Sequence, residues 1–306
     1  MRHVPPIPSR PPGARAARPR AHLPSWIGAA ALLLAAGALF LAEKRWRLRA
    51  PPRGEPARTL RNLALGAASL AVVQVVQRPL VEPLAERVAR ERLGLSQAPP
   101  LPAWARDALA FALLDYTIYA WHVLTHRVPF LWRFHVVHHA DADMDMTTAL
   151  RFHAADMLLS VPWRALQVRA CGASPRALEA WQRFFFASVL LHHSNLRLPL
   201  ALERRLVRVL TTPRLHGIHH SVVREETDSN WSSGLSVWDW LHGTIRVDVP
   251  QDRIEIGVPR WRGAATPGLA ASLALPFGRQ PDAWRTRSGA RIERAPTDLG
   301  DGVFPG

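Results

Sequence analysis

The 306-residue sequence contains a single cysteine, Cys171. One thiol can form neither an internal disulfide nor a CxxC zinc motif, so any metal site must use nitrogen or oxygen ligands. Lysine is almost absent as well, since Lys44 is the only one and arginine supplies nearly all of the positive charge. The sequence also has no flavin, haem or iron–sulfur motif. Any redox chemistry therefore needs electrons from a separate protein.

The charge balance is strongly basic, with a formal net charge of +15 and a pI near 11.6. Such a balance is typical of proteins that bind nucleic acid or an anionic membrane surface. Eleven of the cations lie in residues 1–58, against only Glu43 and Glu55. Because the excess is mostly at one end and no recognition module is visible, the sequence argues against a nucleic-acid-binding protein.

The N-terminal third divides into two segments. Residues 1–24 are rich in Pro, Arg and Ala without an apolar period, which predicts a disordered basic leader. Residues 25–100 are expected to contain N-terminal transmembrane helices. The uncharged run 26–42 is closed by the charged segment 43–47, and the run 63–77 lies between Arg61 and Arg78, before Pro79 and Pro83 interrupt it. A cleaved signal peptide is the alternative for the first run, but no small-x-small cleavage site follows it.

A third apolar run covers residues 103–124 and contains Asp115. An acid inside a membrane helix is costly and suggests function, whereas a partly buried helix of a soluble core is the alternative. The shorter apolar runs 157–168 and 177–191 are interpreted as a helical hairpin that dips into the membrane and returns. Residues 249–306 are rich in Pro, Arg and Gly and are expected to form a polar C-terminal cap and tail.

Twelve of the 14 histidines lie between His122 and His242. They include one HxxxH motif, two HxxHH motifs and one histidine pair. Residues four apart share a helix face, so we expect the three rings of each HxxHH motif to gather into one tridentate cluster. Imidazole suits iron, zinc, copper and nickel, and these rings suffice for two metals. The alternative, histidines that satisfy one another or lie on a solvated face, does not explain two HxxHH motifs so spaced.

The order of these motifs resembles the fatty acid hydroxylase/sterol desaturase superfamily of membrane di-iron enzymes. The resemblance covers residues 101–248 and rests on six segments: 122–126, 132–139, 148–153, 193–199, 212–220 and 228–244. It implies an all-α fold, an integral membrane helical bundle with a cytoplasmic histidine-rich metal-binding cap, in which residues 101–248 are the catalytic domain. Four departures from the family pattern remove no ligand: Ala154, Asp156, the pair Trp231–Ser232, and His242.

The resemblance also implies the site residues. The expected metal ligands are His122, His126, His135, His138, His139, His193, His216, His219 and His220, with His153 as a further candidate. His192 and His242 are weaker candidates. Polar residues expected to support the ligand rings are Asp115, Asn195, Asp228 and Asn230. Asp115, Tyr116 and Tyr119 lie one to two turns before His122, where they are candidates to line the approach of the substrate.

Such an enzyme would use two iron ions, O2 and electrons from a separate reductase or ferredoxin-type donor to hydroxylate or desaturate a C–H bond of a lipid, such as a fatty acyl chain or a sterol or isoprenoid. Ether cleavage and aldehyde conversion remain open. We expect a multi-pass protein of a bacterial inner membrane with its metal site facing the cytoplasm. The alternative is a membrane metal transporter or metal-binding protein, but the histidines bunch at helix ends instead of spreading through the spans.

Overall fold

The computed structural model describes residues 25–50, 56–262 and 267–294. Within these ranges the protein is helical, with three isolated β-bridges and no strand, which confirms the predicted all-α class. The predicted leader 1–24 and the last residues of the tail, 295–306, lie outside the described part. The main helices are α1 (Ser25–Arg45), α2 (Pro56–Val72), α3 (Arg78–Glu91), α4 (Ala103–Arg127), α5 (Pro129–His139), α6 (Ala154–Cys171) and α7 (Pro175–His193).

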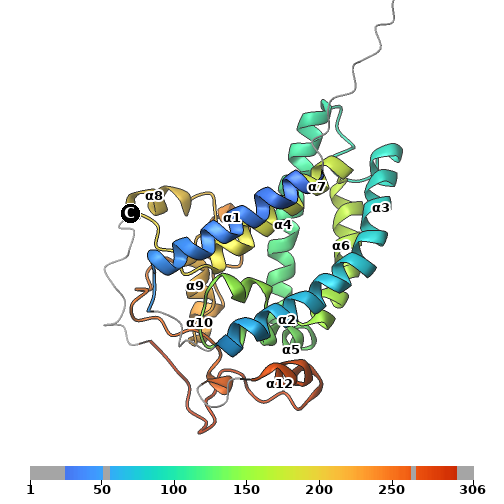
Figure 1. The fold of residues 1–306 in the computed structure, drawn as a ribbon. Helices are drawn as coiled ribbons and strands as arrows, with labels where there is room; N and C mark the ends of the chain where they lie inside the picture. The colour runs from blue at the N-terminus through green and yellow to red at the C-terminus, as the bar shows by residue number, and fades with distance from the viewer. Residues whose placement is uncertain (1–24, 51–55, 263–266, 295–306) are drawn as a thin grey trace, which may run out of the picture.

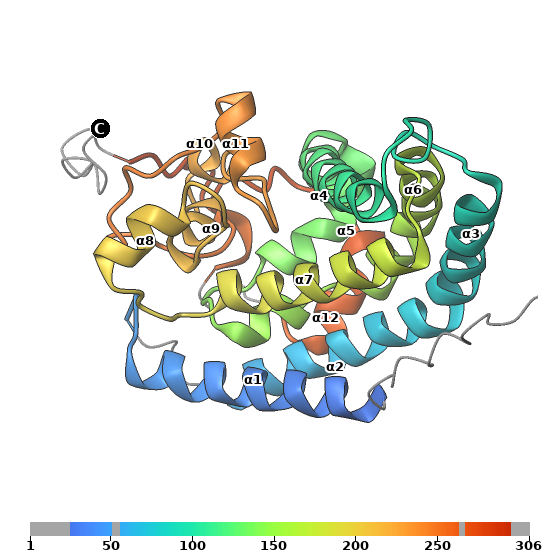
Figure 2. The same ribbon diagram turned by 90° about the horizontal axis from the view of Figure 1, so that it is seen from above.

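The shorter elements follow α7 or connect the main helices. They are the π-helical turn η1 (Val73–Gln77), the 3-10 turns η2 (Met146–Leu150), η3 (Pro259–Trp261) and η5 (Leu275–Phe277), and the helices α8 (Leu200–Leu206), α9 (Pro213–His219), α10 (Arg224–Thr227), α11 (Val237–His242) and α12 (Leu269–Ala274). Figures 1 and 2 show α8, α9 and α10 gathered at one end of the molecule, away from α3 and α6.

Two helices of the described part are long and apolar enough to cross a membrane: the continuous Pro56–Glu91 and α4. The first is expected from the sequence to break at Pro79 and Pro83, yet it runs through both prolines. The π-helical turn η1 directly precedes them. A proline removes a backbone donor and crowds the preceding turn, and a wider π turn accommodates this inside a continuous helix.

The boundaries of α6 and α7 follow from capping residues. Gly172 ends α6 with a left-handed φ of 80°, a conformation that glycine adopts without strain. Ser174 then caps α7 by accepting a hydrogen bond from Ala177 N, with Pro175 in the first turn. The two apolar runs are therefore helices joined by a short turn, and both pack against α4. That they dip into the membrane as a hairpin stays a prediction.

The apolar core lies between α3, α4, α6 and α7. It includes Val88, Leu114, Val168 and Trp181, which are almost completely buried. The core occupies the N-terminal halves of α4 and α7, whereas the C-terminal ends of these two helices carry histidines. Both helices thus run from an apolar core into a polar interior, and this arrangement positions the candidate site.

Candidate metal centre

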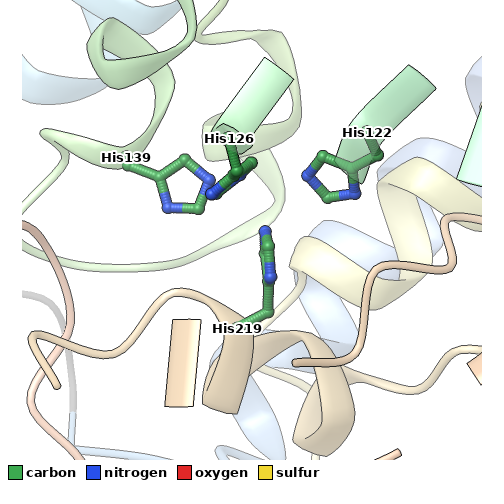
Figure 3. A group of neighbouring side chains, drawn as sticks. All are labelled: His122, His126, His139 and His219. Carbon is green, nitrogen blue, oxygen red and sulfur yellow. The ribbon is translucent and has the colours of Figure 1, made fainter. Parts of the chain in front are cut away.

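A first histidine group is formed by His122 and His126 of α4, His139 of α5 and His219 of α9. One ligand atom from each ring lies within 4.8 Å of those of the other three. The rings point toward a common centre from three helices (Figure 3). The ring centroids of His122 and His219 are 4.5 Å apart, and those of His126 and His139 are 4.6 Å apart.

The hydrogen bonds of this group leave its Nε2 atoms facing the centre. His122 Nδ1 lies 2.7 Å from Trp231 O, and His219 Nδ1 lies 2.9 Å from Ser229 O. A carbonyl oxygen only accepts, so each Nδ1 carries the hydrogen and each Nε2 keeps a free lone pair. The Nε2 atoms of His126, His139 and His219 are buried without a hydrogen-bond partner. Such orphaned acceptors fit a bound cation.

A second histidine group contains His138, His193, His216 and His220. His193 Nε2 lies 3.0 Å from both His138 Nε2 and His216 Nε2, and His216 Nε2 lies 3.2 Å from His220 Nε2. Imidazole nitrogens bound roughly 2.0–2.1 Å from one ion are roughly 3.0–3.4 Å apart. The spacing of this group therefore fits a metal ion, while His193 Nδ1 donates to Val189 O at 2.8 Å.

Each HxxHH motif is divided between the two groups, so the expectation of one tridentate cluster per motif does not describe the structure. His138 and His139 are adjacent in α5 but belong to different groups, as do His219 and His220. Adjacent helical residues point about 100° apart. Each HxxHH motif therefore supplies rings to both groups.

His135 lies beside the first group. Its ring centroid is 4.9 Å from that of His126 and 5.1 Å from that of His139. His135 Nδ1 lies 3.2 Å from Asp156 Oδ2, and its Nε2 is buried without a partner. A carboxylate behind an imidazole fixes the tautomer and orientation of a ligand ring. Asp156, which is singled out in the sequence only as a departure, therefore orients His135.

Two further histidines lie outside both groups. His153 caps α6: its Nδ1 accepts from Ala155 N at 3.0 Å, and its Nε2 lies 3.2 Å from Leu273 O. Both ring nitrogens are therefore occupied. His192 is completely buried, and neither of its ring nitrogens makes a hydrogen bond of standard geometry, although the backbone of Ser233 lies beside the ring. Its ring centroid lies 4.0 Å from that of His216.

Among the described residues, Asp115 is hydrogen-bonded to two tryptophans and a main-chain N–H and to no imidazole. Its carboxylate accepts hydrogen bonds from Trp238 Nε1 at 2.8 Å, Leu235 N at 2.9 Å and Trp181 Nε1 at 3.4 Å. These contacts fasten the segment before α11 to α4 and α7. The neighbouring Tyr119 stacks on the exposed His242, with ring centroids 5.1 Å apart.

The segment Asp228–Asn230 acts on the site through its backbone. Asn230 has a left-handed φ of 52° and is clamped at both ends of its amide: Nδ2 donates to Leu215 O and Arg246 O, and Oδ1 accepts from Arg246 N. The carbonyls on either side, of Ser229 and Trp231, are the acceptors of the first group's imidazoles. Asn230 thus holds the two carbonyls in place without touching a histidine ring.

Two acids near this segment have different roles. Asp228 forms ion pairs with Arg127 at 3.3 Å and Arg224 at 3.7 Å on the protein surface. Asp239 is buried and accepts from Trp231 N and Ser232 N, both at 2.9 Å. Asp239 is not among the expected site residues, although it lies in the segment 228–244 that carries part of the resemblance.

A buried ion pair lies next to His139. Arg58 forms two hydrogen bonds with the fully buried Asp141, at 2.8 and 2.9 Å. Burial alone would raise the pKa of Asp141, but the Arg58 charge lowers it below its ordinary value. Arg151 Nε donates to Val137 O at 2.8 Å, which ties the same region to α5. The sequence gives no signal for these contacts, because Arg58 and Asp141 are 83 residues apart.

Burial keeps the histidines neutral. Removal from water lowers the pKa of His219 to about 3, and it lowers the pKa values of His138, His139 and His220 well below their ordinary range. Neighbouring imidazoles lower the last three further, because the positive charges would repel each other. At neutral pH these rings are uncharged, which is the form that binds a metal.

Residues 108–244 match the family described as fatty acid hydroxylase. The chain is 32% identical to ornithine lipid hydroxylase OlsE of Rhizobium tropici over 176 residues, which are 56% of this chain and 50% of the relative. It is 27% identical to alkylglycerol monooxygenase of Homo sapiens over 139 residues, 45% of this chain and 30% of the relative.

Cholesterol 25-hydroxylase of Rattus norvegicus is also similar, with 27% identity over 154 residues, 49% of this chain and 50% of the relative. The chain therefore spans half or less of the length of these three relatives. No solved structure matches the chain.

Proposed function

Residues 108–244 match the fatty acid hydroxylase family. We propose that this protein is a membrane-bound di-iron oxygenase that hydroxylates a C–H bond of a lipid with O2 and external electrons. The observation that carries the proposal is the pair of buried groups of four histidines, whose ligand atoms lie within 4.8 Å of one another. The three relatives are all named as hydroxylases or monooxygenases, which favours hydroxylation over desaturation.

The two groups would each hold one iron ion. His122, His126, His139 and His219 form one site, with His135 beside it, and His138, His193, His216 and His220 form the other. Iron bound by neutral imidazoles supplies the chemistry that activates O2. The carbonyls of Ser229 and Trp231 and the Asp156 carboxylate orient the rings, and burial excludes water from the reacting carbon.

We propose that the chain crosses a bacterial inner membrane several times, with both metal sites on the cytoplasmic side. The two apolar helices Pro56–Glu91 and α4 support insertion. The segment 43–59 carries six cations, and positive loops tend to remain cytoplasmic. A separate reductase or ferredoxin-type protein would supply the electrons.

Metal transport is a weaker explanation for the same residues. A transporter needs polar groups along a path through its spans. Here the histidines form two closed groups at the C-terminal ends of α4, α5, α7 and α9. This placement supports a fixed centre over a pathway.

The proposal is tested with detergent-purified protein reconstituted anaerobically with Fe(II). We expect two irons per chain and O2 uptake that requires a reductant, both lost in a His138→Ala, His219→Ala double variant. His242→Ala is the matched control, because His242 is exposed and outside both groups. One iron or none per chain, without reductant-dependent O2 uptake, would contradict the proposal. Mass spectrometry of lipids from expressing cells then identifies the oxidised product.

A further inference from the structure

We propose that Arg49, in the segment that follows α1, is a positioning residue for the second histidine group. The inference rests on the proposed function, because it assigns that group a metal ion. Arg49 lies outside the segment that matches the family. It therefore makes the N-terminal segment part of the metal centre in addition to any role in anchoring.

The guanidinium of Arg49 connects two segments that carry ligands. Its Nη1 donates to Pro213 O at 3.1 Å, and its Nη2 lies 3.4 Å from Ser194 O. Ser194 directly follows His193, and Pro213 begins α9, which carries His216. The Arg49 side chain thus joins the C-terminal end of α7 to the N-terminal end of α9. The histidines of these two helices, His193 and His216, meet with their Nε2 atoms 3.0 Å apart.

The backbone around Arg49 is fixed against the same region. Arg49 N donates to Asn195 Oδ1 at 2.9 Å, and Asn195 Nδ2 donates to Arg49 O at 3.2 Å. Leu48 N donates to Asn195 O at 2.8 Å. The Glu43 carboxylate accepts from Asn195 N at 2.9 Å and from Met146 N at 3.0 Å. Asn195 therefore supports the site by holding the N-terminal segment, not by contacting an imidazole.

The site around the guanidinium satisfies both Nη atoms of Arg49, whereas its Nε is buried without a hydrogen-bond partner. Gln251 Oε1 accepts a further hydrogen bond from Nη1 at 2.8 Å. A Cβ at Gly217 would overlap Arg49 Nη1, so glycine leaves the space that the guanidinium occupies. Burial lowers the pKa of Arg49 to about 10, and the group remains charged at neutral pH. Lysine presents no planar fork and cannot reach these divergent acceptors together.

The acceptors of this buried charge are two main-chain carbonyls and an amide oxygen. Burial of a charge is costly, and neutral acceptors repay this cost only partly. The charge does, however, fix the positions of the carbonyls that accept its hydrogen bonds. Such supporting contacts behind a metal ligand typically change metal affinity 10–100-fold when they are removed.

The test compares Arg49→Gln with two controls in the full chain reconstituted with Fe(II). Arg47→Gln alters an exposed arginine two residues away, and Val168→Ala destabilises the distant apolar core. For Arg49→Gln we expect a 10–100-fold weaker affinity for one iron, with the other retained, and a changed Mössbauer signal for one site. Arg47→Gln should keep both irons unchanged. Val168→Ala should lower the Tm while keeping the affinity for both.

The proposal is overturned if Arg49→Gln binds both irons as the wild type does, or if it loses both in parallel with its Tm. If Arg49→Gln does not fold, Arg49→Lys and Gln251→Ala serve instead, with the same selective weakening expected in proportion to the hydrogen bonds lost. Wild-type protein that binds no iron would instead refute the proposed function, which separates the two failures.

Discussion

Asp239 should couple the stability of the protein to the orientation of a candidate metal ligand. Its Oδ2 accepts from Ser232 N, and its Oδ1 accepts from Trp231 N and, at 2.6 Å, from Thr244 Oγ1. In Asp239→Asn, an amide group replaces one of these acceptors, so two donors face each other. A hydrogen bond to a charged group contributes about 1.5–3 kcal/mol, and the remaining bonds lose their charge assistance. We expect a destabilisation of about 2–4 kcal/mol.

The same substitution should weaken metal binding in the first histidine group. Trp231 donates its N–H to Asp239 and accepts at its carbonyl from His122 Nδ1 at 2.7 Å. When this peptide segment loosens, the His122 ring loses its fixed tautomer and orientation. The affinity for the ion in this group should fall about 10–100-fold.

The assay is a thermal melt of metal-free protein in detergent, followed by iron titration. Each kcal/mol shifts the Tm by about 2 °C in a chain of this length, so a fall of about 4–8 °C is expected. Asp252→Asn is the control, because Asp252 is exposed and should change neither quantity. An unchanged Tm would refute the energetic argument. A lower Tm with unchanged affinity for both irons would refute the coupling to His122.

Three other outcomes are expected from the same geometry. His139→Ala should lower iron content, whereas His153→Ala should keep both irons and cost about 1 kcal/mol through loss of the α6 cap; equal iron loss in both variants would contradict this. Asp141→Asn should destabilise metal-free protein by about 1.5–3 kcal/mol, because the buried Arg58 loses one of its two carboxylate partners and keeps only Asp145, while Glu91→Gln in an exposed pair should cost under about 1 kcal/mol. Chelation of reconstituted protein should lower its Tm. The free energy of unfolding should fall by about 2.7 kcal/mol for an ion present at a hundred times its Kd.

The helices could be predicted from the sequence because their signals are local. Apolar runs, Gly172 and Ser174 place α6 and α7 at nearly the predicted residues. The expected break at Pro79 does not occur, because the helix accommodates the proline with a π turn, which packs against α6. The sequence shows that a proline disturbs a helix, but it does not show how the chain adjusts.

The histidine spacing predicted which residues gather but not how they are shared. The i+3 and i+4 relationships place the rings of each HxxHH motif near one another. Their division into two groups depends on where α5 and α9 lie relative to α4 and α7, which is a property of tertiary packing. The contacts of Arg49 with Ser194 and Pro213 join residues 145 and 164 positions apart, and no local pattern indicates them.

The contacts that orient His122 and His219 show why part of the site has no signature in the sequence. Both rings donate to main-chain carbonyls, which every residue type possesses, so the identity of Ser229 or Trp231 carries no information about this role. What requires particular side chains is the path of the backbone: Asn230 adopts a left-handed conformation that asparagine tolerates, and Asp239 holds the next two peptide N–H groups. The departure from the family at Trp231 therefore leaves the His122 contact intact, because the carbonyl, not the side chain, makes it.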